Sequence, residues 1–335
     1  MGLTVAITGP TGDIGRALLR RLDKAPEVDR IIGMARRPFD PPQLGLEKTD
    51  YRRGDILDNF AVSALVEGAD VLVHLAFVIL GGHEETRRVN LEGTRNVFDA
   101  AVSGGVKRFV YTSSVAAYGF HEDNPQPLTE EVPPKGTEEF YYSAQKAELE
   151  RELHRMVDGT ELEAYVFRPC IVAGSDALTM ITAVLEQLQL GGRAPQVTTL
   201  LKTVPFLKPV VPDPGIPFQL VHHDDVAQAL VAGITGRGEP GIYNLAGDGT
   251  ISLSDFASAL GWYAVPVPQF AVEVVADLID RIPFAPAQLS WINAGRVPVL
   301  MDTQKARDKL GWQPAHDTRE TLLEMAETAR AEGLV

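Results

Sequence analysis

Hydrophobic positions in the first half of the chain form short aliphatic runs separated by amphipathic stretches. Continuous aliphatic runs suit the strands of a parallel sheet that is buried on both faces, and apolar residues at helical spacing between them suit helices packed on that sheet. The alternation predicts strand–helix–strand units and an α/β fold with a doubly wound parallel sheet. The predicted strands are 4–8, 30–35, 48–53, 71–75, 109–113 and 164–167, and the predicted helices are 15–24, 59–66, 85–102 and 140–157.

The pattern changes after about residue 175, where prolines interrupt the hydrophobic runs. Residues 195–218 contain six prolines and are otherwise largely aliphatic, which excludes a regular helix or a central strand. Long apolar loops without regular secondary structure usually have a function, such as binding a ligand. Further along, the pattern predicts strands at 218–221 and 241–245 and helices at 225–233, 269–281 and 319–331.

A glycine-rich turn follows the first predicted strand directly. Gly9, Gly12 and Gly15 are spaced G-x-x-G-x-x-G and lead into the first predicted helix. Glycines allow a tight turn and a close approach of backbone N–H groups to a pyrophosphate, and the helix N-terminus adds partial positive charge. An ordinary turn would also use glycines, but the strand–turn–helix context favours dinucleotide binding.

The end of the second predicted strand indicates which dinucleotide binds. NAD sites usually carry an acid about 20 residues after the turn, whereas this strand ends in Arg36 and Arg37. A guanidinium can pair with a 2′-phosphate, so we expect NADP, with NAD as the alternative. Without a role in cofactor binding, the two arginines would simply be solvated surface residues. Asp55 follows the third strand and is either an acceptor for the adenine amino group or a helix cap.

A second motif carries candidate proton chemistry. Tyr142 and Lys146 lie four residues apart in a predicted helix and so share one face. An ammonium and an oxidised nicotinamide would lower the pKa of the phenol, which could then exchange a proton with an alcohol or a carbonyl. Ser113 and Ser114 end the fifth predicted strand, where open α/β sheets bind ligands, and either could hold the substrate oxygen.

Composition narrows the range of partners. The chain has 31 basic and 45 acidic residues, a net charge of −14, a single cysteine, and no long uncharged apolar run. These values argue against nucleic-acid binding, disulfides and a membrane span, and they favour a cytoplasmic protein. The adjacent His222 and His223 would point to opposite sides of a strand, so we expect no metal site there.

Taken together, these motifs resemble the extended branch of the short-chain dehydrogenase/reductase superfamily, the NAD-dependent epimerase/dehydratase family. The resemblance covers nearly the whole chain. It rests on Thr8-Gly-x-x-Gly-x-x-Gly15, Asp55-Ile56, His74-Leu75-Ala76, Asn90-Leu-Glu-Gly-Thr94, Ser113-Ser-Val-Ala-Ala-Tyr118-Gly119, Tyr142-x-x-x-Lys146, Arg168-Pro169, Val221-His-His-Asp-Asp-Val-Ala227, Tyr243-Asn-Leu-Ala246 and Leu310-Gly-Trp-Gln-Pro314.

The resemblance implies a Rossmann-type dinucleotide-binding domain at 1–175, completed by about 218–246, and a smaller substrate-binding lobe at 176–335 that is interleaved with it. It implies that Ser114, Tyr142 and Lys146 are catalytic, that Asn90 supports the sheet, and that Asp225 caps a helix. The implied cofactor residues are Gly9, Thr11, Gly12, Asp13, Ile14, Gly15, Arg36, Arg37, Asp55, Ile56, Leu75, Ala76, Tyr142, Lys146, Pro169 and Val172. The implied substrate residues are Val78, Ser114, Tyr118 and Cys170, although a buried structural thiol is the favoured interpretation of Cys170.

Two departures from the family pattern bear on the substrate. Asp13 stands where many sugar-nucleotide members have an aromatic residue, and the second half lacks a clear basic set for a nucleotide diphosphate. We therefore expect a reductase or dehydrogenase for a largely apolar carbonyl or alcohol. The alternatives are a sugar-nucleotide epimerase or dehydratase and a non-catalytic NADP-sensing regulator. The resemblance further implies a homodimer packed through 85–102 and 140–157.

Overall fold

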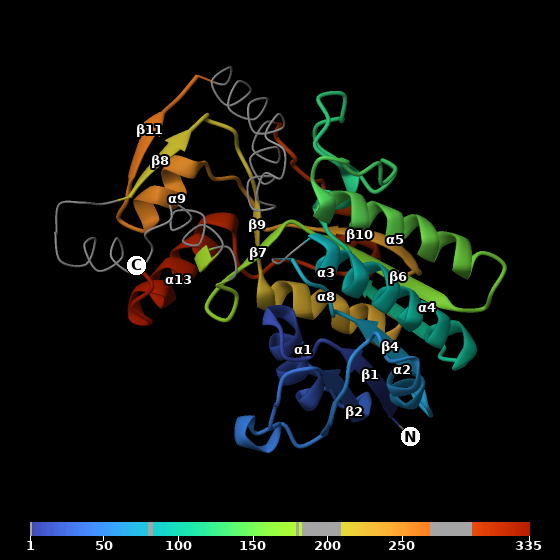
Figure 1. Ribbon diagram of the computed structural model, residues 1–335. Helices are drawn as coiled ribbons and strands as arrows, with labels where there is room; N and C mark the ends of the chain where they lie inside the picture. Colours follow the sequence, from blue (N-terminus) through green and yellow to red (C-terminus); the bar gives the residue numbers. More distant parts are fainter. Residues whose placement is uncertain (1, 80–82, 179–180, 183–208, 269–296) are drawn as a thin grey trace.

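A seven-stranded parallel sheet forms the centre of the larger part of the molecule (Figure 1). The computed structural model describes residues 2–79, 83–178, 181–182, 209–268 and 297–335. The strand order β10-β6-β5-β4-β1-β2-β3 is that of a doubly wound sheet, which confirms the predicted fold class. The strands are β1 (Leu3–Thr8), β2 (Val28–Ala35), β3 (Thr49–Arg53), β4 (Val71–His74), β5 (Arg108–Thr112), β6 (Glu163–Pro169) and β10 (Gly241–Leu245).

Successive strand residues enter two different hydrophobic cores, one on each face of the sheet. In β1, Val5 and Ile7 pack into one core and Ala6 into the other. Val5 is paired with Val71 of β4, which joins the first core as well. Burial on both faces explains why these strands are continuous aliphatic runs rather than alternating ones.

Helices cover both faces (Figure 1). The core on one face contains α1 (Asp13–Lys24) and α8 (His223–Thr235), and the core on the other contains α2 (Asn59–Val66), α4 (Thr94–Ser103) and α5 (Tyr141–Val157). The remaining helical segments of the described chain are α3 (His83–Arg87), α9 (Leu253–Ala259), α12 (Gln304–Leu310), α13 (Thr318–Ala331), the π-helical η2 (Arg88–Gly93) and the 3₁₀ turns η1 (Pro42–Leu44) and η3 (Val115–Tyr118).

The helix predicted at 85–102 is wrong as a single α-helix. It consists of α3, the π-helical turn η2 and α4. Within η2, Asn90 is fully buried and its amide bonds the backbone of Val78, with Nδ2 donating to the carbonyl oxygen at 2.9 Å and Oδ1 accepting from N–H at 2.8 Å. A π-helical turn changes the direction of the side chains around it, a feature common at functional sites. Asn90 therefore supports the loop that follows β4, whereas the expectation was that it supports the sheet itself.

A smaller lobe lies to one side of the sheet (Figure 1). Its core includes Phe256, Trp262 and Met325. The predicted helices 225–233 and 319–331 correspond to α8 and α13, and the predicted strand 218–221 to β9. The predicted helix 269–281 and most of the proline-rich segment 195–218 lie outside the described residues. The strands of the lobe and of its junction with the sheet are β7 (Ile171–Ala173), β8 (Val210–Asp213), β9 (Leu220–His222) and β11 (Tyr263–Pro266), paired β7 with β9 and β8 with β11.

Asp225 does not cap a helix, contrary to expectation. It is fully buried inside α8 and accepts from the backbone N–H groups of Ala315 (2.9 Å) and His316 (3.1 Å). The N-cap of α8 is His222, whose Nδ1 accepts from the N–H of Asp224. Asp225 thus fastens the segment that leads into α13 to the core.

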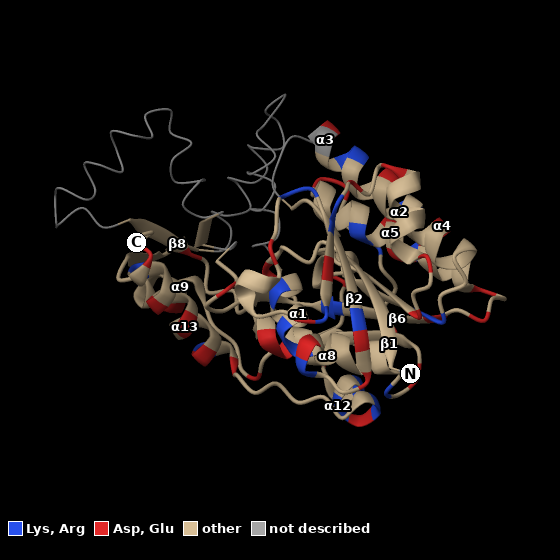
Figure 2. Ribbon diagram, turned by 90° about the horizontal axis from the view of Figure 1, so that it is seen from below, with Lys and Arg blue, Asp and Glu red and all other residues tan. Residues whose placement is uncertain are grey.

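Acidic and basic residues lie close together on the outer helices α1 and α12 (Figure 2). On α1 they form pairs such as Arg16 with Asp13. Among the described residues, no helix is both long and apolar enough to cross a membrane.

Candidate functional site

The glycine turn brings three stretches of backbone into close contact. Gly9 has φ +74, and a Cβ there would lie 2.7 Å from the backbone nitrogen of Ala76. A Cβ on Gly15 would lie 2.5 Å from the carbonyl oxygen of Gly9. These two positions need glycine because β1, its turn and the end of β4 pack together without room for a side chain.

Gly12 differs from the other two glycines because its backbone faces open space. It is exposed, and a Cβ there would meet only the Gly9 oxygen at 3.6 Å. It is also the N-cap of α1 and provides no side-chain cap for the first N–H groups of that helix. An uncapped helix N-terminus beside open space fits a pyrophosphate. Thr11 precedes Gly12, and Asp13 and Ile14 are the first two residues of α1, so all three lie next to this helix N-terminus.

The predicted adenosine end lies past β2 and β3. Arg36 and Arg37 are exposed. Asp55 accepts from the N–H of Leu57 at 3.1 Å, a local turn bond that leaves its second oxygen available. Ile56 is buried, and Leu75 and Ala76 are half-buried just after β4. A pocket of about 490 Å³ lies beside these elements, lined by Arg36, Leu57, Glu84, Arg87, Arg88, Val89 and Glu92.

The structure brings Ser114 and Tyr142 together. Ser114 follows β5 and caps η3, accepting from the N–H of Ala116 at 3.2 Å. Tyr142 lies in the first turn of α5, and a hydrogen bond joins its hydroxyl to Ser114. Burial raises the pKa of Tyr142 to about 12, and the bond to Ser114 only partly opposes this. The phenol is therefore protonated at neutral pH.

Lys146 is adjacent to this pair. Its ammonium donates to the carbonyl oxygen of Thr112 at 2.9 Å, and it lies 3.7 Å from the ring centroid of Phe77. Burial lowers the pKa of Lys146 to about 7, opposed by the charge of Glu150. In the chain alone, desolvation of the phenol dominates, and the lowering of the Tyr142 pKa by the ammonium together with an oxidised nicotinamide stays a prediction.

A buried ion pair that was not predicted lies next to Ser114 and Lys146. Glu150 lies one turn beyond Lys146 on α5 and accepts from Arg168 of β6, with Nη2 to Oε2 at 2.5 Å and Nε to both oxygens at 3.0 Å. Ser113 also donates to Glu150. Both charged side chains are almost completely buried. The sequence carried one signal for this pair, a carboxylate spaced i, i+4 from the lysine on the same helix face.

Tyr118 and Cys170 were predicted to contact substrate, and the structure places both in the core. Tyr118 is fully buried, its hydroxyl donates to Asn244 Oδ1 at 2.8 Å, and the Arg168 guanidinium lies 4.3 Å from its ring centroid. Cys170 packs in the same core, and burial raises the pKa of its thiol. The substrate assignment of Tyr118 is wrong because its side chain is fully buried in the core, whereas the burial of Cys170 agrees with the structural role favoured for its thiol. Pro169 is buried at the end of β6, and Val172 and Val78 are half-buried.

An aromatic cluster surrounds Tyr142, and sequence reasoning missed it. Phe77 meets the Tyr142 ring edge-on, with centroids 5.5 Å apart, and Phe140 lies 5.8 Å away. Tyr141, Phe120 and Ile79 complete the cluster. These residues come from three separate segments, so only the folded chain shows that they lie together.

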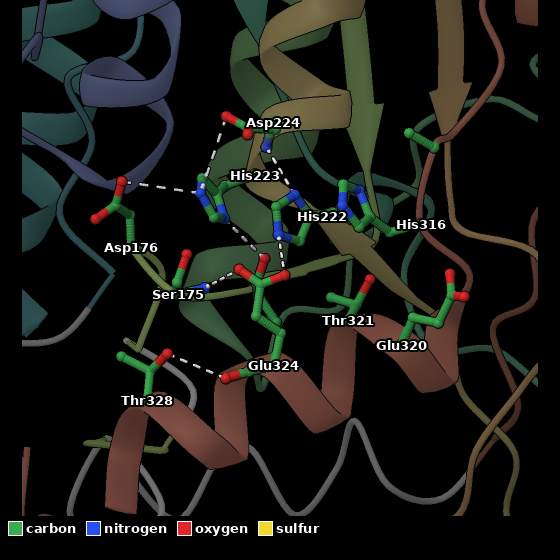
Figure 3. Close-up of polar contacts among 12 residues, drawn as sticks. Ser175, Asp176, His222, His223, Asp224, His316, Glu320, Thr321, Glu324 and Thr328 are labelled. Carbon is green, nitrogen blue, oxygen red and sulfur yellow. Dashed lines mark hydrogen bonds and ion pairs between the residues drawn. The ribbon is translucent and has the colours of Figure 1, made fainter. Parts of the chain in front are cut away.

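The two adjacent histidines do not alternate across a strand, because β9 ends at His222 and α8 begins at His223. Their ring centroids lie 4.2 Å apart, and His316 stacks on His222 at 3.8 Å. Figure 3 shows Glu324 of α13 pointing toward His222 and Ser175. His222 Nδ1 accepts a backbone N–H, so its Nε2 carries the proton that is donated to Glu324 at 3.1 Å. The expectation that the two histidines point to opposite sides of a strand is therefore wrong. The expected absence of a metal at this place stays a prediction.

Comparisons with known proteins agree with this fold. Residues 5–246 match the model of the NAD dependent epimerase/dehydratase family. The uncharacterized protein y4nG of Sinorhizobium fredii is 24% identical over 330 residues, 96% of this chain and 77% of that protein. The crystal structure of gox2253 covers 99% of both chains with a TM-score of 0.75 and 24% identity. The UDP-glucuronic acid 4-epimerase from Bacillus cereus in complex with NAD gives a TM-score of 0.73 at 18% identity, with 98% of this chain and 99% of that chain covered.

Proposed function

The chain belongs to the NAD-dependent epimerase/dehydratase family, and from that premise we propose that it is an NAD(P)(H)-dependent oxidoreductase acting on a largely apolar carbonyl or alcohol. The observation that carries the proposal is the hydrogen-bonded pair Ser114–Tyr142 beside Lys146. This group lies at the carboxyl end of the parallel strands, the edge that also carries the glycine turn. Open α/β sheets bind their ligands at that edge.

Each side chain has a defined task in this proposal. A bound nicotinamide supplies or accepts the hydride. Ser114 donates a hydrogen bond to the substrate oxygen, and Tyr142 gives that oxygen a proton as a carbonyl becomes an alcohol. Lys146 holds a ribose hydroxyl. Because the pKa of Tyr142 is about 12, its side chain is in the proton-donating form at neutral pH, which favours the reductive direction.

We propose NADP as the cofactor, with NAD as the alternative. Support comes from the exposed Arg36 at the end of β2 and from Arg87 and Arg88, which line the same pocket. Guanidinium groups suit a 2′-phosphate. The named NAD complex among the similar structures favours NAD instead. Titration of the protein with NADPH and NADH decides between them, and tighter binding of NADH would contradict the preference.

The aromatic cluster around Tyr142 favours an apolar substrate. Aromatic and aliphatic side chains lie next to the Tyr142 hydroxyl, contributed by Phe77, Ile79, Phe120 and Phe140. Transfer of an apolar substrate from water to such a surface is favourable in free energy. We propose that the lobe, residues 176–335, covers the substrate on the opposite side, while residues 1–175 with about 218–246 hold the dinucleotide.

A second candidate is an epimerase or dehydratase for a sugar nucleotide. It is favoured by the family itself and by similar structures such as the UDP-glucuronic acid 4-epimerase. The same serine, tyrosine and lysine would serve both reactions. The two differ in net cofactor use, since an oxidoreductase consumes one nicotinamide per product and an epimerase recycles its own.

The test is a screen of NADPH and NADH, and of their oxidised forms, against lipophilic ketones, lipophilic alcohols and sugar nucleotides. Absorbance of the reduced nicotinamide and product formation are measured together. The proposal predicts one cofactor converted per molecule of a lipophilic product. Conversion of a sugar nucleotide with no net change in absorbance would support the second candidate instead.

We also propose a cytoplasmic homodimer packed through α4 and α5, on the strength of the family resemblance. Light scattering of the purified protein checks the assembly, and a monomeric mass at micromolar concentration would contradict it.

A further inference from the structure

Phe77 contacts two members of the catalytic group at once. Its ring centroid lies 3.7 Å from the ammonium nitrogen of Lys146. The same ring meets that of Tyr142 nearly at a right angle, with centroids 5.5 Å apart and an interplanar angle of 88°. A cation within about 6 Å of a ring centroid and over its face is attracted by the ring quadrupole, most strongly where water is excluded.

Hydrogen bonds hold the backbone of the two residues that follow Phe77, Val78 and Ile79. Asn90 of η2 bonds both the N–H and the carbonyl of Val78, at 2.8 and 2.9 Å. The hydroxyl of Tyr141 on α5 donates to the carbonyl oxygen of Ile79 at 2.8 Å. Because η2 and α5 both bind this loop, the backbone that carries Phe77 is restrained with its ring over the Lys146 ammonium.

The other groups around Lys146 offer its charge limited support. Glu150 is bonded by Arg168 through three donor–acceptor contacts. Tyr111 presents its ring at 5.1 Å, and Tyr142 has a phenol pKa of about 12, so it is neutral. His74 is fully buried with its pKa lowered to about 3, so it is neutral as well. Thr112 supplies a backbone carbonyl oxygen.

We propose that Phe77 is a positioning residue, whose ring face keeps the Lys146 ammonium charged and aimed toward the ribose-binding side of Tyr142. The role in cofactor binding rests on the proposed function. The contact between Phe77 and Lys146 does not depend on it. Without the ring, burial would favour the neutral amine, which is a weaker donor to a ribose hydroxyl.

The direct test is an NMR titration of protein labelled with ¹³C-lysine. The chain has nine lysines, and the Lys146→Arg variant identifies the signal of residue 146. Phe77→Leu removes the quadrupole and keeps an apolar side chain, so its Lys146 midpoint should fall by about one pH unit. Phe77→Trp should leave the midpoint unchanged or raise it. The matched control is Phe60→Leu on α2, where the ring is 83% exposed, and it should change nothing.

A second variant covers the case in which leucine disturbs the packing. Pentafluorophenylalanine at position 77 keeps the ring and reverses its quadrupole, so it should lower the Lys146 midpoint at least as far as leucine does. An unchanged midpoint in both variants would overturn the inference.

Cofactor titration separates this inference from the proposed function. Phe77→Leu should weaken NADPH binding several-fold at about pH 6.5, between the two midpoints, where its Lys146 is mostly neutral and that of the unaltered protein is mostly charged. The effect should be much smaller at about pH 5.5, where Lys146 is mostly charged in both proteins. Tighter binding by Phe77→Leu at both pH values would mean that the ring obstructs the site, and would overturn the positioning role. Failure of the unaltered protein to bind NADPH or NADH would contradict the proposed function, while the NMR result would still decide the contact between Phe77 and Lys146.

Discussion

At the scale of single residues, a buried charged pair fixes the helix that carries the proposed catalytic residues Tyr142 and Lys146. Glu150 and Arg168 join α5 to β6 within the core, and Ser113 adds a third contact next to Ser114. A buried carboxylate with its partner in place is stable, but a buried guanidinium left alone is strongly unfavourable. The position of Tyr142 and Lys146 on α5 therefore depends on a contact that involves neither of them.

Glu150→Gln should lower the free energy of unfolding by about 3–5 kcal/mol, because it leaves the buried Arg168 charge without its counter-charge. Urea denaturation measures this. Glu148→Gln on the same helix removes a carboxylate that is 39% exposed and paired with Arg95, so it should cost less than about 1 kcal/mol. Equal losses in the two variants would show that burial of the pair is not what stabilises α5.

Residue by residue, the sequence predicted which serine, tyrosine and lysine lie together better than it predicted their surroundings. The serine, tyrosine and lysine could be found because they have a fixed spacing and a fixed place at a strand end. Phe77 and Glu150 could not be assigned roles, since an aromatic residue after a strand and a carboxylate on a helix are common, and only packing shows what they touch. Tyr118 failed for the same reason, because its position near a strand end did not reveal that its ring turns into the core.

At the scale of elements, the junction between α8 and α13 depends on an ionised carboxylate, that of Glu324, and on a neutral imidazole, that of His222. Glu324 of α13 accepts from His222 and from the N–H of Ser175. These bonds lower the pKa of Glu324 to about 2, although burial opposes the shift. The pKa of His222 is lowered by burial and by the neighbouring His223 and His316. Both shifts favour the forms present at neutral pH.

The junction should therefore weaken in acid. Glu324 contributes stability fully above its ordinary pKa near 4.5, and this is lost as pH falls from there toward 2. His222 acts in the same direction at higher pH, since its contribution is complete above about 6.5 and declines as pH falls through its lowered pKa. Urea unfolding at a series of pH values should show a smaller acid loss in Glu324→Gln than in the unaltered protein. A parallel loss in both proteins would contradict this role for Glu324.

At the scale of the whole molecule, the fold could be predicted because local and global requirements agree. A strand buried on both faces, such as β1 with Val5, Ala6 and Ile7, has to be an aliphatic run, and such runs are visible in the sequence. The lobe was harder to predict because it is built from segments far apart in the chain, with β8 paired to β11 and β7 to β9. Pairings of that kind leave no local pattern.

The open glycine turn and the strand-end site should make the whole fold respond to dinucleotide. NADPH at 100 times its dissociation constant should add about 2.7 kcal/mol to the free energy of unfolding and raise the melting temperature by several degrees. Gly12→Val should reduce this rise without a large loss of intrinsic stability, since a side chain at residue 12 would occupy space that the chain itself leaves open. Differential scanning fluorimetry gives both values. A full cofactor response in Gly12→Val would place the pyrophosphate elsewhere.

The proton transfer assigned to Tyr142 is tested most directly by Tyr142→Phe, measured with the carbonyl substrate identified in the screen. The variant loses only the hydroxyl, so it should bind NADPH with nearly unchanged affinity while kcat for carbonyl reduction falls by about 10²–10⁴-fold. Normal cofactor binding together with undiminished reduction would contradict the account.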